Sequence, residues 1–226
     1  MDYRYEVKYC LPSSWGTPTL LELLKRHPAV FTERHPSRPV NNIYFDTIDF
    51  DAAEENVSGY ANRRKVRVRW YGDQFGSNNL ALELKNKKGV VGSKNRYSLG
   101  EIQFYAGDKL DQVFAKSFSQ LPPFAFDIMS SVRPSLMNRY ARSYFQSRCG
   151  RFRATLDTNV CYFAVNQGIF VATPSATLEN TQILEIKYSV ESHRIIDSIT
   201  RHFPFRITKS SKYVSGIDIL SRQGLC

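Results

Sequence analysis

The sequence has 226 residues, 42% of them hydrophobic, which is enough for one domain with a sizeable core. Lysine and arginine number 31 against 21 aspartate and glutamate, and the resulting net charge of +10 predicts an anionic partner such as nucleic acid, nucleotide, a phosphate chain or a membrane surface. No apolar run approaches the ~20 residues of a transmembrane helix and no signal peptide is visible, so we expect a soluble cytoplasmic protein that would reach a membrane only through a membrane-protein partner.

The first half of the chain reads mainly as strands. Residues 3–11 alternate polar and apolar side chains and are predicted to form the first strand. Thr17 before Pro18 is typical of a helix start and predicts a short helix with Thr17 as its N-cap. Further strands are predicted, separated by a helical turn that ends at Gly59, a polar turn and a loop, and they cover residues 42–46, 63–71 and 80–88.

The second half mixes helices and strands. Apolar residues at helical spacing predict a helix between Gly107 and Leu121, and a second helix is predicted within residues 124–137. A later helix is expected from Glu191 to His202, and residues 205–216 are expected to form a last strand that runs into a short C-terminal helix. The remaining predicted strands cover residues 138–147, 151–163, 168–172 and 182–189. We therefore expect a single α+β domain over residues 1–226 whose antiparallel strands close into a barrel.

Five of the predicted strands carry charge at every second position. Side chains on a strand alternate between its two faces, so each charged pair lies on one face while Val, Leu, Ile and Ala lie on the other. Such a pattern over many strands predicts a sheet curled around a charged, mostly cationic lumen that holds a polyanion. The charged groups are Glu6 and Lys8; Arg67 and Arg69; Glu83, Lys85 and Lys87; Arg153 and Asp157; and Glu185 and Lys187.

Cations on several strands suit a phosphate chain. A triphosphate or longer chain spreads its charge over many oxygens, and arginine binds such oxygens in pairs while lysine acts as a point charge. For any single pair, a solvated outer face remains the alternative. The candidates from pattern alone are Arg67, Arg69, Lys85, Lys87, Arg142, Arg153 and Lys209.

Three glutamates lie at the same alternate strand positions as these cations, and so on the same face of the sheet. Glu6, Glu83 and Glu185 are either counter-ions or ligands for Mg²⁺ or Mn²⁺, which prefer oxygen and bridge phosphates. Glu185 is the best metal candidate because the segment ILEIKY around it is otherwise strongly apolar.

Signatures of other chemistry are missing from the sequence. Four cysteines, Cys10, Cys149, Cys161 and Cys226, show no CxxC or zinc-like spacing and are expected to be reduced thiols. No Walker motif, GxSxG or Cys–His arrangement stands out, so covalent hydrolase mechanisms have little support.

The order of the charged segments resembles the VTC domain, the polyphosphate polymerase branch of the triphosphate tunnel metalloenzymes. The segments that carry the resemblance run from about residue 3 to residue 221, in the order RYEVKY, NNIYFDT, RRKVRVRWYG, LELKNKKGVVGSKNRY, NRYARSYFQ, FRATLDT, ILEIKYS and ITKSSKYVSG. The resemblance implies an α+β fold with an eight-stranded antiparallel β tunnel barrel and flanking helices. It also implies that the tunnel binds nucleoside triphosphate or polyphosphate with Mn²⁺ or Mg²⁺.

The resemblance, joined to the charge pattern, assigns roles to individual residues. The catalytic contacts to the transferred phosphates would come from Arg67, Arg69, Lys85, Arg153 and Lys212. Further phosphate binding would come from Lys8, Lys87, Lys94, Arg142, Lys209 and Ser211, and the metal would be held by Glu185 with Glu6. The broader superfamily opens with ExExK, whereas this chain has Arg4, Glu6 and Lys8, so one metal carboxylate is missing. That departure suits the polymerase branch better than the metal-rich hydrolase branch.

The leading prediction is a metal-dependent polyphosphate polymerase that transfers the γ-phosphate of ATP to a polyphosphate chain. A tri- or polyphosphatase of the same fold is the second enzyme hypothesis, and a polyphosphate- or nucleotide-binding module without turnover is the third. A nucleic-acid binder has the least support because no RNP, KH, helix-turn-helix or zinc-finger pattern is present. The expected partners are therefore ATP, polyphosphate or another triphosphate, and no nucleic acid.

Overall fold

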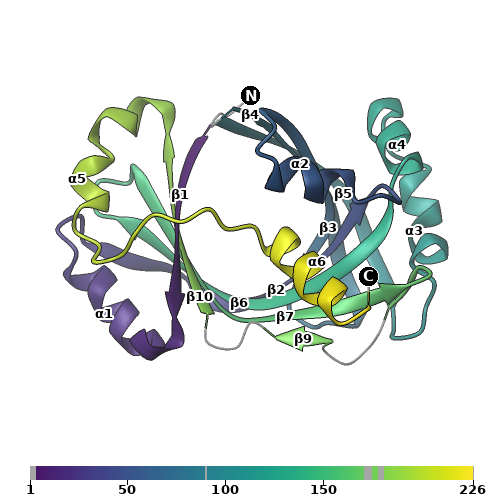
Figure 1. Ribbon diagram of the computed structural model, residues 1–226, viewed down its shortest axis with the longest axis horizontal. Helices are drawn as coiled ribbons and strands as arrows, with labels where there is room; N and C mark the ends of the chain where they lie inside the picture. Colours follow the sequence, from purple (N-terminus) through teal and green to yellow (C-terminus); the bar gives the residue numbers. More distant parts are fainter. Residues whose placement is uncertain (1–3, 90, 171–174, 178–180, 226) are drawn as a thin grey trace. The chain divides into compact units, whose positions relative to one another are not determined.

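The computed structural model describes residues 4–89, 91–170, 175–177 and 181–225 (Figure 1). In these residues eight long strands combine with two two-residue strands, β8 (Ile169–Phe170) and β9 (Ala176–Thr177). The long strands are β1 (Arg4–Pro12), β2 (Phe31–Asp46), β3 (Asn62–Tyr71), β4 (Gly76–Lys88), β5 (Val91–Phe104), β6 (Arg133–Ser147), β7 (Phe152–Asn166) and β10 (Thr181–Ser189). The helices are α1 (Thr17–Arg26), α2 (Asp51–Val57), α3 (Leu110–Phe118), α4 (Pro123–Ser130), α5 (Asp197–Thr200) and α6 (Lys212–Arg222), with 3₁₀ turns η1 (Ser13–Trp15) and η2 (Val190–Ile195).

The chain forms two compact units. Unit 1 comprises Met1–Arg38, Tyr140–Val160 and Leu178–Ser210, and unit 2 comprises Pro39–Arg139, Cys161–Thr177 and Ser211–Cys226. The long strands β2, β6 and β7 each contribute residues to both units. The prediction of one domain over residues 1–226 stays a prediction.

Unit 1 holds the antiparallel strands β1, β10 and β7 side by side, with Lys8 opposite Glu185 and Glu185 opposite Thr155. The intervening residues face the other way, so Tyr9, Leu184 and Leu156 are buried in an apolar cluster. Helix α1 adds Leu20 and Leu24 to this cluster, and the segment after β10 adds Ile196, Ile199 and Phe203. The alternation predicted for these strands is therefore confirmed, with charge on one face and the core on the other.

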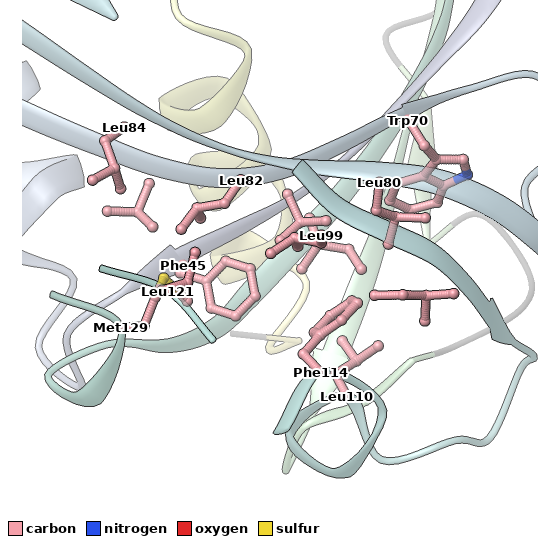
Figure 2. Close-up of a cluster of buried hydrophobic side chains, with 14 of the residues drawn as sticks. Phe45, Trp70, Leu80, Leu82, Leu84, Leu99, Leu110, Phe114, Leu121 and Met129 are labelled. Atoms are coloured by element: carbon pink, nitrogen blue, oxygen red, sulfur yellow. The ribbon is translucent and has the colours of Figure 1, made fainter. Parts of the chain in front are cut away.

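Unit 2 is built on the antiparallel succession β2, β3, β4 and β5. Its apolar face includes Val68, Trp70 and Leu82, which are fully buried. Figure 2 shows how Leu110 and Phe114 of α3 and Met129 of α4 pack together with this face. Burial of whole aromatic and leucine side chains stabilises each by about 1.5–3 kcal/mol, so α3 and α4 fix the sheet whose opposite face carries the charge.

Helix α6 is held tightly within unit 2. Ser211 is its N-cap and accepts a hydrogen bond from the backbone N–H of Val214 at 3.4 Å. Within the first turn, the Tyr213 hydroxyl donates to the Asp46 carboxylate, and the Tyr213 ring stacks on Tyr44. Gly216 lies so close to β7 that an added Cβ would be 2.6 Å from Cδ1 of Tyr162. Only glycine permits this approach of the helix.

Several predicted boundaries are wrong for identifiable reasons. The N-cap of α1 is Gly16, with φ 59°, and the Thr17 hydroxyl instead donates to Oε1 of Gln182 at 3.1 Å. Strand β2 begins at Phe31 rather than residue 42, because its polar first half pairs through contacts such as Arg34 with Gln146. Likewise β6 begins at Arg133, within the helix predicted for residues 124–137, and the polar turn predicted over Gly72 to Asn79 already belongs in part to β4.

The end of the chain also differs from expectation. Residues 206–211 form no strand. Thr208 makes isolated hydrogen bonds with β1, such as the one from its backbone N–H to the Lys8 carbonyl at 2.8 Å, and these do not extend into a ladder. The helix expected from Glu191 to His202 divides into η2 and α5. Among the described residues, Cys10, Cys149 and Cys161 are not joined in disulfides, in agreement with the prediction of reduced thiols. The predictions for Cys226 and for residues 171–172 lie outside the described residues.

Candidate functional site: two cation clusters built around buried glutamates

The first cluster lies in unit 2 around Glu83. Arg67 donates from Nε and Nη2 to Oε2 of Glu83 at 3.0 and 2.7 Å, and Lys94 donates to Oε1 at 2.9 Å. Nη1 of Arg69 lies 3.8 Å from the same carboxylate. Burial by itself would raise the pKa of Glu83, but Arg67, Arg69 and Lys94 outweigh it and hold the pKa far below its usual range. Glu83 is therefore an ionised counter-ion, the simpler of the two roles open from the sequence.

The strand register explains why these groups meet. Residues directly opposite each other on antiparallel strands share a face, and Arg67 lies opposite Glu83 across β3 and β4. The next pair along places Lys65 opposite Lys85, and Lys85 lies opposite Lys94 on β5. Three lysines thus occupy one row across three strands. Like charges placed directly opposite each other are destabilising, so such a row indicates a site for an anion.

A polar chain fixes the second arginine of this cluster. Nε of Arg69 donates to Oδ1 of Asn42 at 2.7 Å, and Nδ2 of Asn42 donates to Oδ1 of Asn138 at 2.8 Å. All three side chains are buried, and Nδ2 of Asn138 has no hydrogen-bond partner among the described residues. Guanidinium orientation here is therefore set by the protein before any ligand arrives.

The N-terminus of α6 contributes to the same charged face. Nζ of Lys65 donates to Oγ of Ser211 at 2.6 Å, and Lys212 is buried at the first position of the helix. An amine and an oriented helix N-terminus together favour negative charge.

The second cluster lies in unit 1 around Glu185. Nζ of Lys8 lies 3.3 Å from Oε1 of Glu185, and Nζ of Lys187 lies 2.6 Å from Oε2. Arg142 reaches Oε2 at 3.5 Å, while its Nε and Nη2 bind the two oxygens of the fully buried Asp157 at 2.5 and 2.6 Å. Glu185 is 6% exposed, so a buried carboxylate again organises several cations.

Lys8 joins this cluster to Glu6. Its ammonium lies 2.8 Å from Oε1 of Glu6 and donates to the Ser210 carbonyl at 3.0 Å. Burial alone would lower the pKa of Lys8, but Glu185 and Glu6 raise it well above the ordinary value. The amine therefore stays charged between two carboxylates.

Thr155 completes the row that begins with Lys8 and Glu185. Its hydroxyl is buried and has no hydrogen-bond partner among the described residues. A buried hydroxyl without a partner is costly, and on this face a phosphate oxygen or a metal-bound water would satisfy it.

Solved structures of other proteins share the fold of this chain at low sequence identity. A Vibrio parahaemolyticus protein named as an adenylate cyclase candidate is 11% identical with a TM-score of 0.55, over 97% of this chain and 98% of that chain. A Bacillus halodurans protein named in the same way is 14% identical with a TM-score of 0.51, over 93% and 96%. No curated protein matches the sequence.

The VTC domain family matches residues 3–221, nearly the whole chain. The chain belongs to the VTC domain family. The family match and the shared fold confirm the predicted fold class, an α+β protein with an antiparallel β tunnel barrel and flanking helices. In the described residues, no helix of this VTC domain is long and apolar enough to cross a membrane.

The predicted site residues fall into the two units. Unit 2 holds Arg67, Arg69, Lys85, Lys87, Lys94, Ser211 and Lys212. Unit 1 holds Glu6, Lys8, Arg142, Arg153, Glu185 and Lys209. Arg153 and Lys209 have exposed side chains, whereas Arg69, Arg142 and Lys212 are buried. The roles assigned to these residues remain predictions.

The donor set around Glu185 fits a divalent metal that is shared with substrate. Among the described residues no group of three or more His, Cys, Asp or Glu side chains could enclose a metal ion. Mg²⁺, however, is usually held by one or two carboxylates together with substrate phosphates, and Glu185 and Glu6 both reach the same ammonium. Tunnel metalloenzymes use divalent metals, and the assignment of one to Glu185 and Glu6 stays a prediction.

Sequence reasoning missed four members of the clusters. Lys65 has the same strand parity as Arg67, so the signal for it was present. Asn42 and Asn138 meet through a hydrogen bond across 96 positions, and a pairing so distant has no local signal. Thr155 shares the parity of Arg153 but is an ordinary residue for a strand.

Proposed function

We propose that this VTC domain is a metal-dependent polyphosphate polymerase that transfers the γ-phosphate of ATP to a polyphosphate chain in the cationic tunnel of its family. The observation that carries the proposal is the pair of cation clusters, each organised around a buried glutamate on the charged face of its sheet. Phosphoryl transfer needs little covalent help from the protein and relies on positioning and on stabilisation of charge.

The unit 2 cluster supplies phosphate contacts. Arg67 and Arg69 bind phosphate oxygens with guanidinium N–H groups, and Glu83 and Asn42 hold them in place beforehand. Lys85, with Lys87, Lys94, Ser211 and Lys212, supplies further positive charge. Preorganised cations cost little reorganisation at the moment of transfer, which is why this arrangement lowers the barrier.

The unit 1 cluster supplies the metal carboxylate and further cations. A divalent metal held by this cluster would supply neutralisation of the charge on the substrate phosphates. Glu185, with Glu6, offers it oxygen ligands, while Lys8, Arg142, Arg153 and Lys209 bind phosphate oxygens. Arg4 in place of a further carboxylate leaves fewer metal ligands than the hydrolase branch has, which favours the polymerase over the phosphatase.

The test is incubation of the purified protein with γ-labelled ATP and Mn²⁺ or Mg²⁺, followed by separation of products on a high-percentage gel. A labelled polymer ladder is the expected result. Free phosphate without polymer would reassign the protein as a hydrolase, and neither product would favour a binding module.

Glu185→Gln is the matching variant, because it keeps the shape of the side chain and removes its charge. We expect turnover to fall by roughly 100-fold or more, since a metal supplies several kcal/mol of transition-state stabilisation. Glu22→Gln, which changes an exposed glutamate paired with Arg26 in α1, is the control and should leave turnover unchanged. Metal-dependent turnover that survives in Glu185→Gln would refute the metal role.

A further inference from the structure

A cationic hollow of about 310 Å³ lies in unit 1, where β1 and β7 begin and β6 and β10 end. Its volume falls within the ~300–1,000 Å³ that ligand pockets usually have. None of the described residues that line it is acidic, and five are cations: Arg4, Arg34, Arg151, Arg153 and Lys187.

The strand register concentrates this charge. Arg153 lies directly opposite Lys187 across β7 and β10, although like charges in that position destabilise a sheet. Arg4 lies opposite Ser189, two residues farther along β10. A concave surface with one sign of charge focuses the electrostatic potential and attracts anions. The hollow therefore has the character of an anion site.

The hollow begins where the Glu185 cluster ends. Lys187 belongs to both, since its ammonium lies 2.6 Å from Oε2 of Glu185 and its side chain lines the hollow. An anion long enough to extend past Lys187 would meet Arg153 and then the remaining arginines. A triphosphate held at Glu185 has too few phosphate units to extend far into the hollow. A polyphosphate chain is longer and carries a charge on every unit, so it can contact these arginines.

The hollow adjoins a second, larger one. This hollow of about 560 Å³ shares Arg34, Gln146 and Gly150 with the first and adds one cation, Arg148, and one acidic residue, Glu33. Nη1 of Arg34 donates to Oε1 of Gln146 at 2.6 Å, so the guanidinium is oriented at the junction. The two hollows together give room for a chain rather than for a single ion.

We propose that the hollow is a second phosphate-chain site, which binds units of polyphosphate beyond those at the Glu185 cluster and so makes affinity depend on chain length. This proposal rests on the proposed function for the identity of the chain. Continuity with the Glu185 cluster favours polyphosphate over nucleic acid as the occupant.

The experiment measures binding without turnover, by titrating the full-length protein with tripolyphosphate and with long-chain polyphosphate. Arg34→Gln/Arg151→Gln is the test variant, because neither residue is assigned to the catalytic clusters and both are exposed. We expect about tenfold weaker binding of the long chain, the size of one or two lost charge-assisted hydrogen bonds, with tripolyphosphate affinity unchanged. Arg194→Gln/Arg201→Gln, an equal loss of charge at exposed residues of unit 1 outside the hollow, should change neither affinity. Arg34→Lys/Arg151→Lys should restore part of the long-chain affinity.

Unchanged long-chain affinity in the test variant would overturn the proposal, as would an equal loss for tripolyphosphate. An equal loss for single-stranded DNA would show a general polyanion surface instead of a polyphosphate site. If long-chain binding is lost as expected but no polymer forms from ATP, the proposed function fails while the hollow stands.

Discussion

The buried pair of Arg142 and Asp157 allows a stringent test of how the Glu185 cluster is stabilised. Asp157→Asn removes one negative charge and keeps the size of the side chain. The carboxylate is 0% exposed, and its two oxygens bind Nε and Nη2 of Arg142. After the change, the amide presents an N–H₂ group to the guanidinium, and Glu185, with Oε2 at 3.5 Å from Nη2 of Arg142, remains as a counter-charge.

The expected loss of stability is large. Removing one partner of a buried ion pair usually costs 3–5 kcal/mol, because the other charge stays buried without compensation. Glu185 compensates in part, so we expect about 3 kcal/mol. For a chain of this size each kcal/mol lowers Tm by roughly 2–4 °C, so Tm should fall by roughly 6–12 °C.

The chain contains its own control. Arg222 and Asp218 make the same two-atom contact within α6, with both distances at 3.1 Å, but the aspartate is 55% exposed. Asp218→Asn should therefore cost no more than about 0.5 kcal/mol. Urea unfolding of the wild type and both variants, followed by circular dichroism, gives the comparison. Equal losses in Asp157→Asn and Asp218→Asn would refute the argument that burial decides the value of the pair.

Further predictions concern single groups. Folding lowers the pKa of Glu83, so its contribution to stability is complete above the ordinary pKa of 4.5 and is lost as the pH falls below that value. In urea unfolding, the difference in stability between wild type and Glu83→Gln should therefore shrink by roughly 1.4 kcal/mol between about pH 7 and 3.5. Thr155→Val should keep stability within about 1 kcal/mol, since it removes an unpaired buried hydroxyl, yet weaken tripolyphosphate binding in a titration, whereas Thr155→Ser should retain it. Slight burial would raise the pKa of the Cys149 thiol, but hydrogen bonds with Ser147 and Arg151 lower it to about 7, so its alkylation rate should level off above about pH 8. Gly216→Ala should destabilise the protein by more than about 1 kcal/mol in thermal unfolding despite the better helix propensity of alanine, because the new Cβ would collide with Tyr162.

Each of these has a result that contradicts it. A pH-independent difference for Glu83→Gln would mean that the carboxylate is not held ionised by its neighbours. Normal tripolyphosphate binding by Thr155→Val would remove the hydroxyl from the site. A rate for Cys149 that keeps rising to pH 9, or a more stable Gly216→Ala, would contradict the local contacts on which those predictions depend.

The alternation of charge along the strands was sufficient to predict the charged face and most of its residues. Arg67 with Arg69, and Glu185 with Lys187, lie on the face that parity requires because the strand period is two. The partners across the face were not predictable in the same way. Lys65 and Ser211 are 146 positions apart in the sequence, and no local pattern around either residue predicts their hydrogen bond.

Local signals also failed where tertiary contacts decide the backbone. Residues 32–38 contain charged residues and proline with no apolar alternation, and they form strand because β6 lies alongside, as the bond between Arg38 and Tyr144 shows. Conversely, residues 206–211 have alternating character, but their backbone is fixed by Thr208 contacts with β1 and not by a ladder. In both segments, contacts with β6 or β1 determine the backbone conformation, and the local sequence pattern does not.

The charged face of unit 2 also constrains how the chain folds. A slip of β3 by one residue against β4 would move Lys65, Arg67 and Arg69 into the cluster shown in Figure 2 and bring Val68 and Trp70 to the polar side. Because that error is so costly, these cationic residues also serve to exclude misregistered hairpins. Leucine at all three cationic positions would make both faces of the strand apolar and leave the pairing poorly specified. The cations proposed to bind phosphate would therefore also help the hairpin of β3 and β4 to fold in the correct register.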